Sequence, residues 1–365
     1  MNPRLIIDAH EDVAYNALVM GRDFHLAAQA TRAHESQAAR DHVALRELPQ
    51  HGGLALLGLP DLLRGNVRVV FATLYATPAN NPYNLPGRTY TTPEQAEALA
   101  REHLAYYALL AADPRITLIT SRADLERVIA AREPKLGLVL LMEGADPIVR
   151  PEDAASWFAS GVRLVGPSWG ATRYAGGTGA PGPLTELGRA LMRDLSRAGF
   201  ILDTSHMSEA SFFEALDLFE GPVVASHSNA RVFVPTDRHL SDDMIRAIAV
   251  RDGVIGVVLY NAFLKQGWRE AGARKDDVPL AIAVEHIKHM CDLAGDTRHV
   301  GIGSDFDGGF GVESAPREID TVADLQKVAE ALSAAKFGDE DIDNILSGNW
   351  LRILRKALPA DGAAQ

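Results

Sequence analysis

The chain has 365 residues, of which 47% are hydrophobic and 23% charged, the balance of an ordinary globular protein. Its formal net charge of −12 argues against a nucleic-acid partner, because phosphate binding needs a basic surface. No apolar stretch approaches the ~20 residues that span a bilayer, so we expect no membrane-spanning segment.

Eight short apolar runs follow one another along the chain, and each has the composition of a strand buried on both faces. Most of them are separated by segments in which apolar residues recur at the three- and four-residue spacing of a helix. Strands that alternate with helices imply a parallel sheet, and eight repeats imply its closure into a (β/α)8 barrel of the TIM type. The runs are 5–8, 67–75, 136–142, 162–165, 200–203, 222–225, 254–259 and 300–303.

Helices are expected over 92–112, 184–198, 209–219, 242–250 and 279–294, and three of them have recognisable starts. Thr92, Ser208 and Ser241 each precede acidic residues, as N-caps do. The structural rival is a doubly wound open sheet, which usually has a glycine-rich turn after its first strand. That place is taken here by His10-Glu11-Asp12, so we favour the α/β barrel.

We expect residues 1–365 to form one barrel domain with two insertions, at about 22–63 and 78–91. Both would lie over or beside the end of the barrel where the strands finish, which is where such barrels carry their chemistry. A neutral surface elaboration would explain either insertion equally well.

Acidic and histidine residues stand just past the ends of several runs. His10 and Asp12 form an H-x-D pair, and alternation along an extended segment points both side chains the same way. Glu143 emerges from a buried strand and needs a partner, which a strand-end salt bridge would also supply. His206 and His227 occupy matching settings, LDTSHMS and VASHSNA. Either histidine alone would be explained as a hydrogen-bonded core residue, but together with the other three they favour a metal site.

Mixed nitrogen and oxygen ligands suit zinc, and also manganese, iron or cobalt. Five ligands exceed what a closed tetrahedral site uses, and they fit two metal ions that share a bridging carboxylate. Asp305, in GIGSDFDGG, would be a further ligand, a general base or a partner for Arg238, and Asp307 a loop-capping residue.

Other candidates have simpler explanations. His286 and His289 lie mid-helix, away from the strand ends, so a packed or solvated helix face explains them. The segment 176–182, GGTGAPG, lacks the lysine of a P-loop, and we interpret it as a mobile loop. Cys291 is the single cysteine, which excludes an intramolecular disulfide, and we expect it to be a small buried residue. With no signal-peptide core in MNPRLIIDAHED, we expect a cytoplasmic protein.

Taken in order, DAHED, MEGAD, LDTSHMS, SHSNAR, GIGSDFDG and SGNWLRIL resemble the membrane (renal) dipeptidase family of binuclear zinc peptidases. The resemblance covers residues 5 to about 354, and although each motif is short, their order is specific. It implies an amidohydrolase-like barrel, hydrolysis of dipeptides, including those with a C-terminal D-residue, by a hydroxide that bridges two zinc ions, and a homodimer.

The resemblance also implies roles for individual residues. His10, Asp12 and Glu143 would bind one zinc, and Glu143, His206 and His227 the other. Asp305 matches the family's acid/base aspartate. Arg238 matches the arginine that holds the free carboxylate of the dipeptide, for which its planar fork is suited.

Two departures from the family pattern stand out. The family places a substrate-binding histidine after the fourth strand, whereas this chain reads LVGPSWGATRYAGG there. Trp169, Arg173 and Tyr174 are substitutes by type, and spacing does not choose among them. The family's asparagine between the first two ligands is replaced by Glu11, for which a supporting role beside the metal is an option.

Three functions compete on the sequence. The first is a zinc-dependent dipeptidase, and the second keeps two metals but cleaves another small amide, an N-acyl amino acid or a lactone. The third is a metal-binding protein that has lost catalysis, which the retention of five ligands and Asp305 disfavours.

Overall fold

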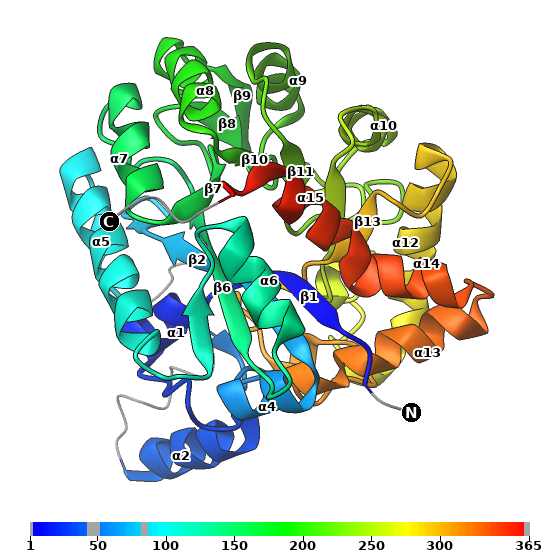
Figure 1. The fold of residues 1–365 in the computed structure, drawn as a ribbon. Coiled ribbons are helices and arrows are strands. Elements are labelled where there is room, and N and C mark those ends of the chain that lie inside the picture. Colours follow the sequence, from blue (N-terminus) through cyan, green and yellow to red (C-terminus); the bar gives the residue numbers. More distant parts are fainter. Residues whose placement is uncertain (1–2, 42–51, 82–86, 361–365) are drawn as a thin grey trace.

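The computed structural model describes residues 3–41, 52–81 and 87–360, and in these ranges eight parallel strands close into a barrel (Figure 1). Closure occurs because β2 pairs with β1 on one side and with β6 on the other. The predicted barrel is therefore confirmed, and each predicted run supplies one strand. In order around the barrel they are β1 (Ile6–Glu11), β2 (Val67–Tyr75), β6 (Leu136–Glu143), β7 (Val162–Gly166), β10 (Ile201–Asp203), β11 (Val223–Ala225), β12 (Val254–Val257) and β13 (Val300–Ile302).

Helices surround the strands on the outside of the barrel (Figure 1). The five predicted helices are α5 (Pro93–Leu110), α8 (Glu186–Ala198), α9 (Glu209–Leu218), α10 (Asp242–Val250) and α12 (Leu280–Ala294), each ending within two residues of its predicted bounds. The side chains of Thr92, Ser208 and Ser241 accept backbone N–H bonds as the predicted N-caps. The other α-helices of the described residues are α1 (Val13–Met20), α2 (Ala28–Asp41), α4 (Leu59–Arg64), α6 (Arg122–Ala130), α7 (Ala154–Ala159), α11 (Asn261–Leu264), α13 (Gln326–Ala334), α14 (Asp339–Asp343) and α15 (Asn349–Ala357).

The hydrophobic core has two layers, one between the strands and the helices and a smaller one inside the barrel. Helix α15 lies across the end at which the strands begin (Figure 1). Its Trp350 is fully buried, packs edge-on against Phe71 at 5.2 Å and donates its indole N–H to the Ile302 carbonyl at 3.0 Å. This end of the barrel is therefore filled, and any site must lie at the opposite end, which we call the mouth.

The two insertions contribute short elements near the mouth. The first contains α2 and α4, and its residues 42–51 lie outside the described ranges. Strands β3 (Thr77–Pro78) and β4 (Thr89–Tyr90) form a small parallel pair at the ends of the second, whose residues 82–86 also lie outside them. Strand β5 (Ile116–Leu118) extends the sheet alongside the beginning of β6. Among the described helices, none has the length and apolar character needed to cross a bilayer.

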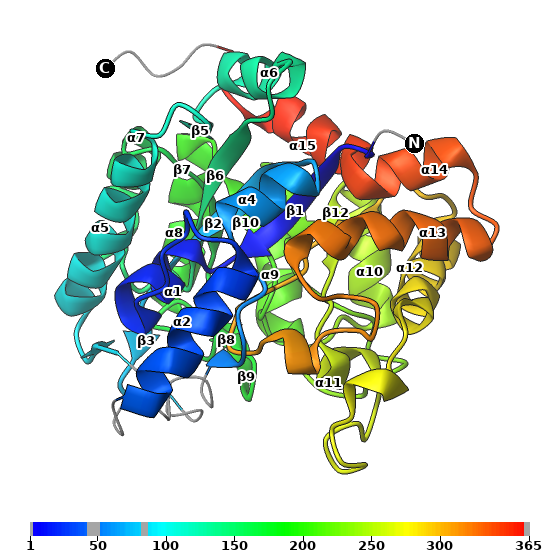
Figure 2. The same ribbon diagram turned by 90° about the horizontal axis from the view of Figure 1, so that it is seen from below.

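The interpretation of 176–182 as a mobile loop is wrong. This segment is part of an antiparallel hairpin formed by β8 (Ala175–Gly177) and β9 (Ala180–Leu184), which lies beside α9 (Figure 2). The glycines allow the two backbones to meet, since a Cβ on Gly176 would lie 2.2 Å from the Gly182 nitrogen. Ser208, the N-cap of α9, bonds to both N–H and carbonyl of Gly182, so the hairpin is held against the barrel.

Candidate metal centre

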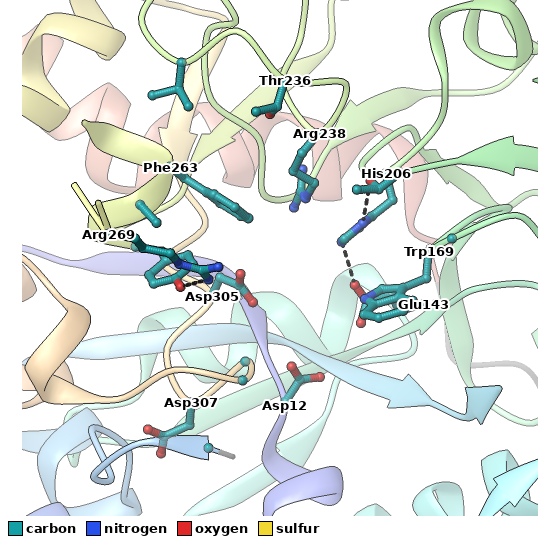
Figure 3. Close-up of a pocket in the computed structure, with 18 of the residues that line it drawn as sticks. Asp12, Glu143, Trp169, His206, Thr236, Arg238, Phe263, Arg269, Asp305 and Asp307 are labelled. Atoms are coloured by element: carbon teal, nitrogen blue, oxygen red, sulfur yellow. Dashed lines mark hydrogen bonds and ion pairs between the residues drawn. The ribbon is translucent and has the colours of Figure 1, made fainter. Parts of the chain in front are cut away.

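The ligand-type residues predicted from the strand ends converge on one cavity of about 600 Å³ at the mouth (Figure 3). Asp12, Glu143, His206, Arg238 and Asp305 line this cavity. His10 and His227 lie directly behind them, each 1% exposed. Residues separated by almost 300 positions in the sequence thus meet because parallel strands all finish at the same end of the barrel.

An irregularity in β1 helps to direct its two ligand-type residues. Between Asp8 and Glu11 the strand loses its regular register with β2, so that Asp8 pairs with Val70 and Glu11 with Ala72. Such a bulge re-aims side chains next to active sites. Asp12 is held by a hydrogen bond from the Thr73 hydroxyl on the neighbouring strand.

Glu143 is the centre of the cluster. Its Oε1 lies 3.2 Å from His206 Nε2 and 3.4 Å from His227 Nε2, and its Oε2 lies 3.6 Å from His10 Nε2. The two Nε2 atoms of His206 and His227 are only 3.0 Å apart. The His10 and His227 rings are stacked with their centroids 3.5 Å apart. Both oxygens of one carboxylate therefore face imidazole nitrogens from three strands.

The second nitrogen of two of these rings has a hydroxyl partner. His206 Nδ1 lies 3.1 Å from the Thr178 hydroxyl, and His227 Nδ1 lies 2.7 Å from that of Ser226. When each Nδ1–H donates to its hydroxyl, each Nε2 lone pair faces Glu143. Three acceptor atoms then meet at one point, which is unfavourable unless a cation lies between them.

The electrostatics of the cluster agree with this geometry. Burial lowers the pKa of His206 to about 4 and that of His227 well below its usual range, and both rings are therefore neutral, as metal ligands must be. Burial and the charge of Glu143 raise the pKa of Asp12 to about 6. Burial alone would lower the pKa of His10, but Glu143, Asp12 and Asp305 raise it to about 10.

The residues fit a pair of divalent cations. Within the described residues, His10, Asp12 and Glu143 form one group whose ligand atoms lie within 4.8 Å of one another, and Glu143, His206 and His227 form a second. His10, His227 and Asp305 form a third. Both ring nitrogens of His10 are buried without a hydrogen-bond partner, a cost that a bound cation would remove.

Asp305 and Arg238 flank the cluster. Asp305 Oδ1 is 3.8 Å from His10 Nε2, and burial raises the pKa of its carboxyl well above the usual range. Arg238 is 5% exposed and donates to the His227 carbonyl at 2.7 Å and to the Ser228 hydroxyl at 3.2 Å. These bonds hold its guanidinium at the cavity wall opposite Asp12 (Figure 3).

Two of the predicted site residues have a strained backbone conformation. His206 and Asp305 have φ angles of 65° and 62°, the left-handed region that non-glycine residues rarely adopt. Such conformations persist where the surrounding structure enforces them and are common at functional sites. The tight turns that end β10 and β13 therefore aim these two side chains across the mouth.

Of the three residues considered as substitutes for a histidine after the fourth strand, one reaches the cavity. Trp169 lines it, with its ring 5.9 Å from that of His206 and 5.3 Å from that of Tyr75. Tyr174 is fully buried and donates to the Ile148 carbonyl. Arg173 donates to the same carbonyl and lies 3.6 Å from Asp146, so both residues brace a loop outside the cavity.

His286, His289 and Cys291, which we expected to have structural roles, lie outside the cavity lining. His286 is buried between the Ala230 N–H and the Leu264 carbonyl, while His289 bonds to Asp242 at 2.9 Å. Cys291 is a buried free thiol.

Asp307 caps the backbone of the first insertion by accepting the N–H groups of Leu56 and Leu57. Glu11, the last residue of β1, is fully buried and outside the cavity lining, and burial raises the pKa of its carboxyl group well above the usual range.

Sequence reasoning missed Thr178, Ser226 and Asp203. The Ser226 hydroxyl donates to Asp203 Oδ2 at 2.5 Å, and the Ser226 N–H donates to Oδ1 of the same carboxylate at 2.8 Å. Ser226 directly precedes His227, which was the one available signal. Nothing in the sequence connects Thr178, at the turn of the β8–β9 hairpin, with His206.

Known proteins match the chain over almost its full length. A family model described as "Membrane dipeptidase (Peptidase family M19)" matches residues 2–364. A Klebsiella pneumoniae protein named "Uncharacterized protein in pqqA 5'region" is 35% identical over 283 residues, covering 74% of this chain and 98% of the relative. The dipeptidase aclJ of Aspergillus oryzae is 26% identical over 328 residues, which cover 86% of this chain and 73% of the relative.

Among solved structures, a metallo peptidase from Rhodobacter sphaeroides superposes with a TM-score of 0.78 at 25% sequence identity. The match covers 98% of this chain and 100% of the Rhodobacter chain. It carries a phosphinate mimic of the dipeptide L-Ala-D-Ala.

Proposed function

Because the chain belongs to the membrane dipeptidase family, peptidase family M19, and is thus a metal-dependent dipeptidase, we propose that its cavity holds two zinc ions and hydrolyses dipeptides, including those with a C-terminal D-residue. One observation carries the proposal. Glu143 belongs to two overlapping ligand groups, with His10 and Asp12 on one side and His206 and His227 on the other.

In this proposal Glu143 would be shared by the two ions, His10 and Asp12 would help to hold one of them, and His206 and His227 the other. When bound, the ions would acidify a water molecule and polarise the scissile carbonyl. Manganese, iron or cobalt would suit the same donors, so metal analysis of the purified protein is needed to identify the bound ions. The Rhodobacter sphaeroides relative holds a phosphinate mimic of L-Ala-D-Ala, which supports the proposal that the substrate is a dipeptide whose second residue can be a D-amino acid.

Arg238 is the proposed anchor of the substrate's free carboxylate. Its guanidinium has five N–H donors in a rigid plane, which matches the two oxygens of a carboxylate. The bonds to Ser228 and to the His227 backbone fix its orientation, so little side-chain entropy is lost when the substrate binds. Burial strengthens the attraction, because the cavity wall excludes water.

Asp305 is the proposed proton carrier. Burial, and then the charges of Asp12 and Glu143, raise the pKa of its carboxyl group, which makes its carboxylate a stronger base than that of a free aspartate. An acid/base group works best when its pKa is near the working pH. Asp305 would accept a proton from the attacking water and pass it to the leaving amine.

The proposal is tested by assaying the purified full chain with L,L- and L,D-dipeptides while measuring its metal content. We expect dipeptide turnover, about two zinc ions per chain, and loss of both in Glu143→Gln. Glu133→Gln, at an exposed carboxylate, is the matched control. Two bound zinc ions without turnover of any dipeptide would contradict the proposal.

We also propose that residues 1–365 form one domain, that the protein works in the cytoplasm and that it forms a homodimer. The buried free thiol of Cys291 supports a reducing compartment. A single cooperative unfolding transition tests the first point, cell fractionation the second, and sedimentation velocity the third.

A further inference from the structure

The outer wall of the cavity is built by the segment that follows α11, in which Gln266 and the residues up to Glu270 line the opening. This segment is anchored to the body of the protein. Trp268 is 3% exposed and donates its indole N–H to the Arg274 carbonyl at 2.8 Å. Lys265 Nζ donates to the Asp277 carbonyl at 3.2 Å.

Arg269 points from this segment into the cavity, toward Asp305 (Figure 3). Its guanidinium lies 5.4 Å from the ring centroid of Tyr260 and donates to the Tyr260 hydroxyl. Tyr260 is in turn stacked on Phe310, with centroids 4.4 Å apart and the planes 16° from parallel. The Arg269 charge is therefore held in position by an aromatic stack.

No carboxylate among the described residues forms an ion pair with Arg269, including Glu270 beside it. By contrast, the arginines of the surrounding surface commonly have acidic partners, as Arg231 has in Glu209 at 2.6 Å. Arg269 is exposed at the rim of the cavity, where a guanidinium with no ion-pair partner among the described residues can bind an anionic group of a substrate.

The two arginines of the cavity stand at opposite ends of one aromatic wall. Arg238 lies 5.4 Å from the Phe263 ring, and the rings of Phe263 and Tyr260 are 4.9 Å apart, with Arg269 beyond Tyr260. A dipeptide whose α-carboxylate is held by Arg238 would direct its C-terminal side chain along this wall.

We infer that Arg269 makes the enzyme selective for dipeptides whose C-terminal residue carries a second carboxylate, aspartate or glutamate. This inference rests on the proposed function, in which Arg238 holds the α-carboxylate. A guanidinium can form two parallel hydrogen bonds to the two charged oxygens of a carboxylate, whereas the isosteric amide offers one neutral oxygen as acceptor.

The test compares L-Ala-L-Asp with its isosteric amide L-Ala-L-Asn, together with their L,D isomers and L-Ala-L-Ala, on the zinc-loaded full chain. We expect kcat/KM to be about tenfold higher for the acid than for the amide, mainly through KM. In Arg269→Gln this ratio should fall to about one. Arg274→Gln is the matched control, because its side chain is 70% exposed and outside the cavity lining, and it should keep the wild-type ratio.

The outcomes distinguish a failure of the inference about Arg269 from a failure of the proposed function. Turnover of L-Ala-L-Ala without a preference for the acid, or a preference that survives in Arg269→Gln, would overturn the inference alone. A preference for L-Asp-L-Ala over L-Asn-L-Ala, without one at the second residue, would also overturn it. No turnover of any dipeptide would overturn the proposed function, and the inference with it.

Discussion

The Asp203 carboxylate and the His227 imidazole are joined through a single hydroxyl, that of Ser226. The hydroxyl lies 2.7 Å from His227 Nδ1 and donates to Asp203 at 2.5 Å. Because the hydroxyl proton is committed to the carboxylate, the ring must donate its Nδ1–H, which leaves Nε2 as an acceptor facing Glu143. One carboxylate at the end of β10 thus fixes the tautomer of a histidine at the end of β11.

Ser226→Ala should therefore weaken metal binding without unfolding the protein. Partners of this kind typically contribute about 10- to 100-fold in metal affinity, so a loss of that size is expected. Competition with a chelator of known affinity measures it, and circular dichroism checks the fold. Ser160→Ala is the control, because this hydroxyl lies at the C-cap of α7, where it donates to the Ser156 carbonyl and accepts from Arg101, and has no contact with the ligand cluster. Equal affinity in the Ser226 variant and the wild type would contradict the assigned tautomer.

Zinc binding at pH 8 should release at least one proton per chain. His10 is protonated in the metal-free protein at that pH, because neighbouring carboxylates outweigh burial and raise its pKa to about 10. A ligand imidazole must be neutral, so the metal displaces this proton. Below about pH 6 Asp12 is protonated too, since its pKa is raised to about 6, and zinc affinity should fall more steeply there.

Calorimetry in buffers of different ionisation enthalpy counts the released protons directly. His10→Asn removes the protonated ring and should reduce the count by about one. A proton release of zero in the wild type would show that His10 is already neutral or takes no part in binding.

Trp169 and Tyr174 should behave differently when substituted, although only four residues lie between them. Trp169→Ala removes a cavity wall beside His206 and should lower kcat/KM by about tenfold or more. Tyr174→Phe removes a buried hydrogen bond to Ile148 and should cost about 1 kcal/mol of stability while leaving kcat/KM unchanged. Steady-state kinetics and urea unfolding measure the two effects. Equal kinetic losses in both variants would place Tyr174 at the substrate.

Asp307→Ala should destabilise the protein strongly. The carboxylate accepts two backbone N–H groups and lies 3.5 Å from the buried Arg22 guanidinium, all of which would be left without this partner. A loss of about 2–4 kcal/mol follows from these terms. Urea unfolding measures it, and Asp217→Ala, on the exposed face of α9, should change stability by less than about 0.5 kcal/mol. Similar midpoints for both variants would contradict this account.

The barrel and its strand-end residues were predictable because both follow from local patterns. An apolar run such as 136–142 has few alternatives to a buried strand, and parallel strands must bring residues such as Glu143 and His227 to one end. The N-caps at Thr92, Ser208 and Ser241 were predictable for a similar reason, since a hydroxyl before an acidic first turn is a local signal.

The β8–β9 hairpin was not predictable in this way. Its glycine- and proline-rich strands lack side-chain alternation, and its place is fixed by tertiary bonds such as those from Ser208 to Gly182. The orientation of Arg173 and Tyr174 likewise depends on the Ile148 carbonyl, a partner about 25 residues away in the chain. Spacing alone contains no information on such contacts.

The left-handed backbone conformation at His206 and Asp305 lowers the stability of the fold, while it orients the two side chains toward the cavity. A non-glycine residue in that region costs about 1–2 kcal/mol. Glycine at either position would relieve this strain and remove a buried polar group, and the metal-free protein would become harder to unfold as it became inert. The folded protein is thus less stable than it would be with glycine at these two positions, and this cost is localised at the turns that hold the proposed ligand His206 and the proposed proton carrier Asp305.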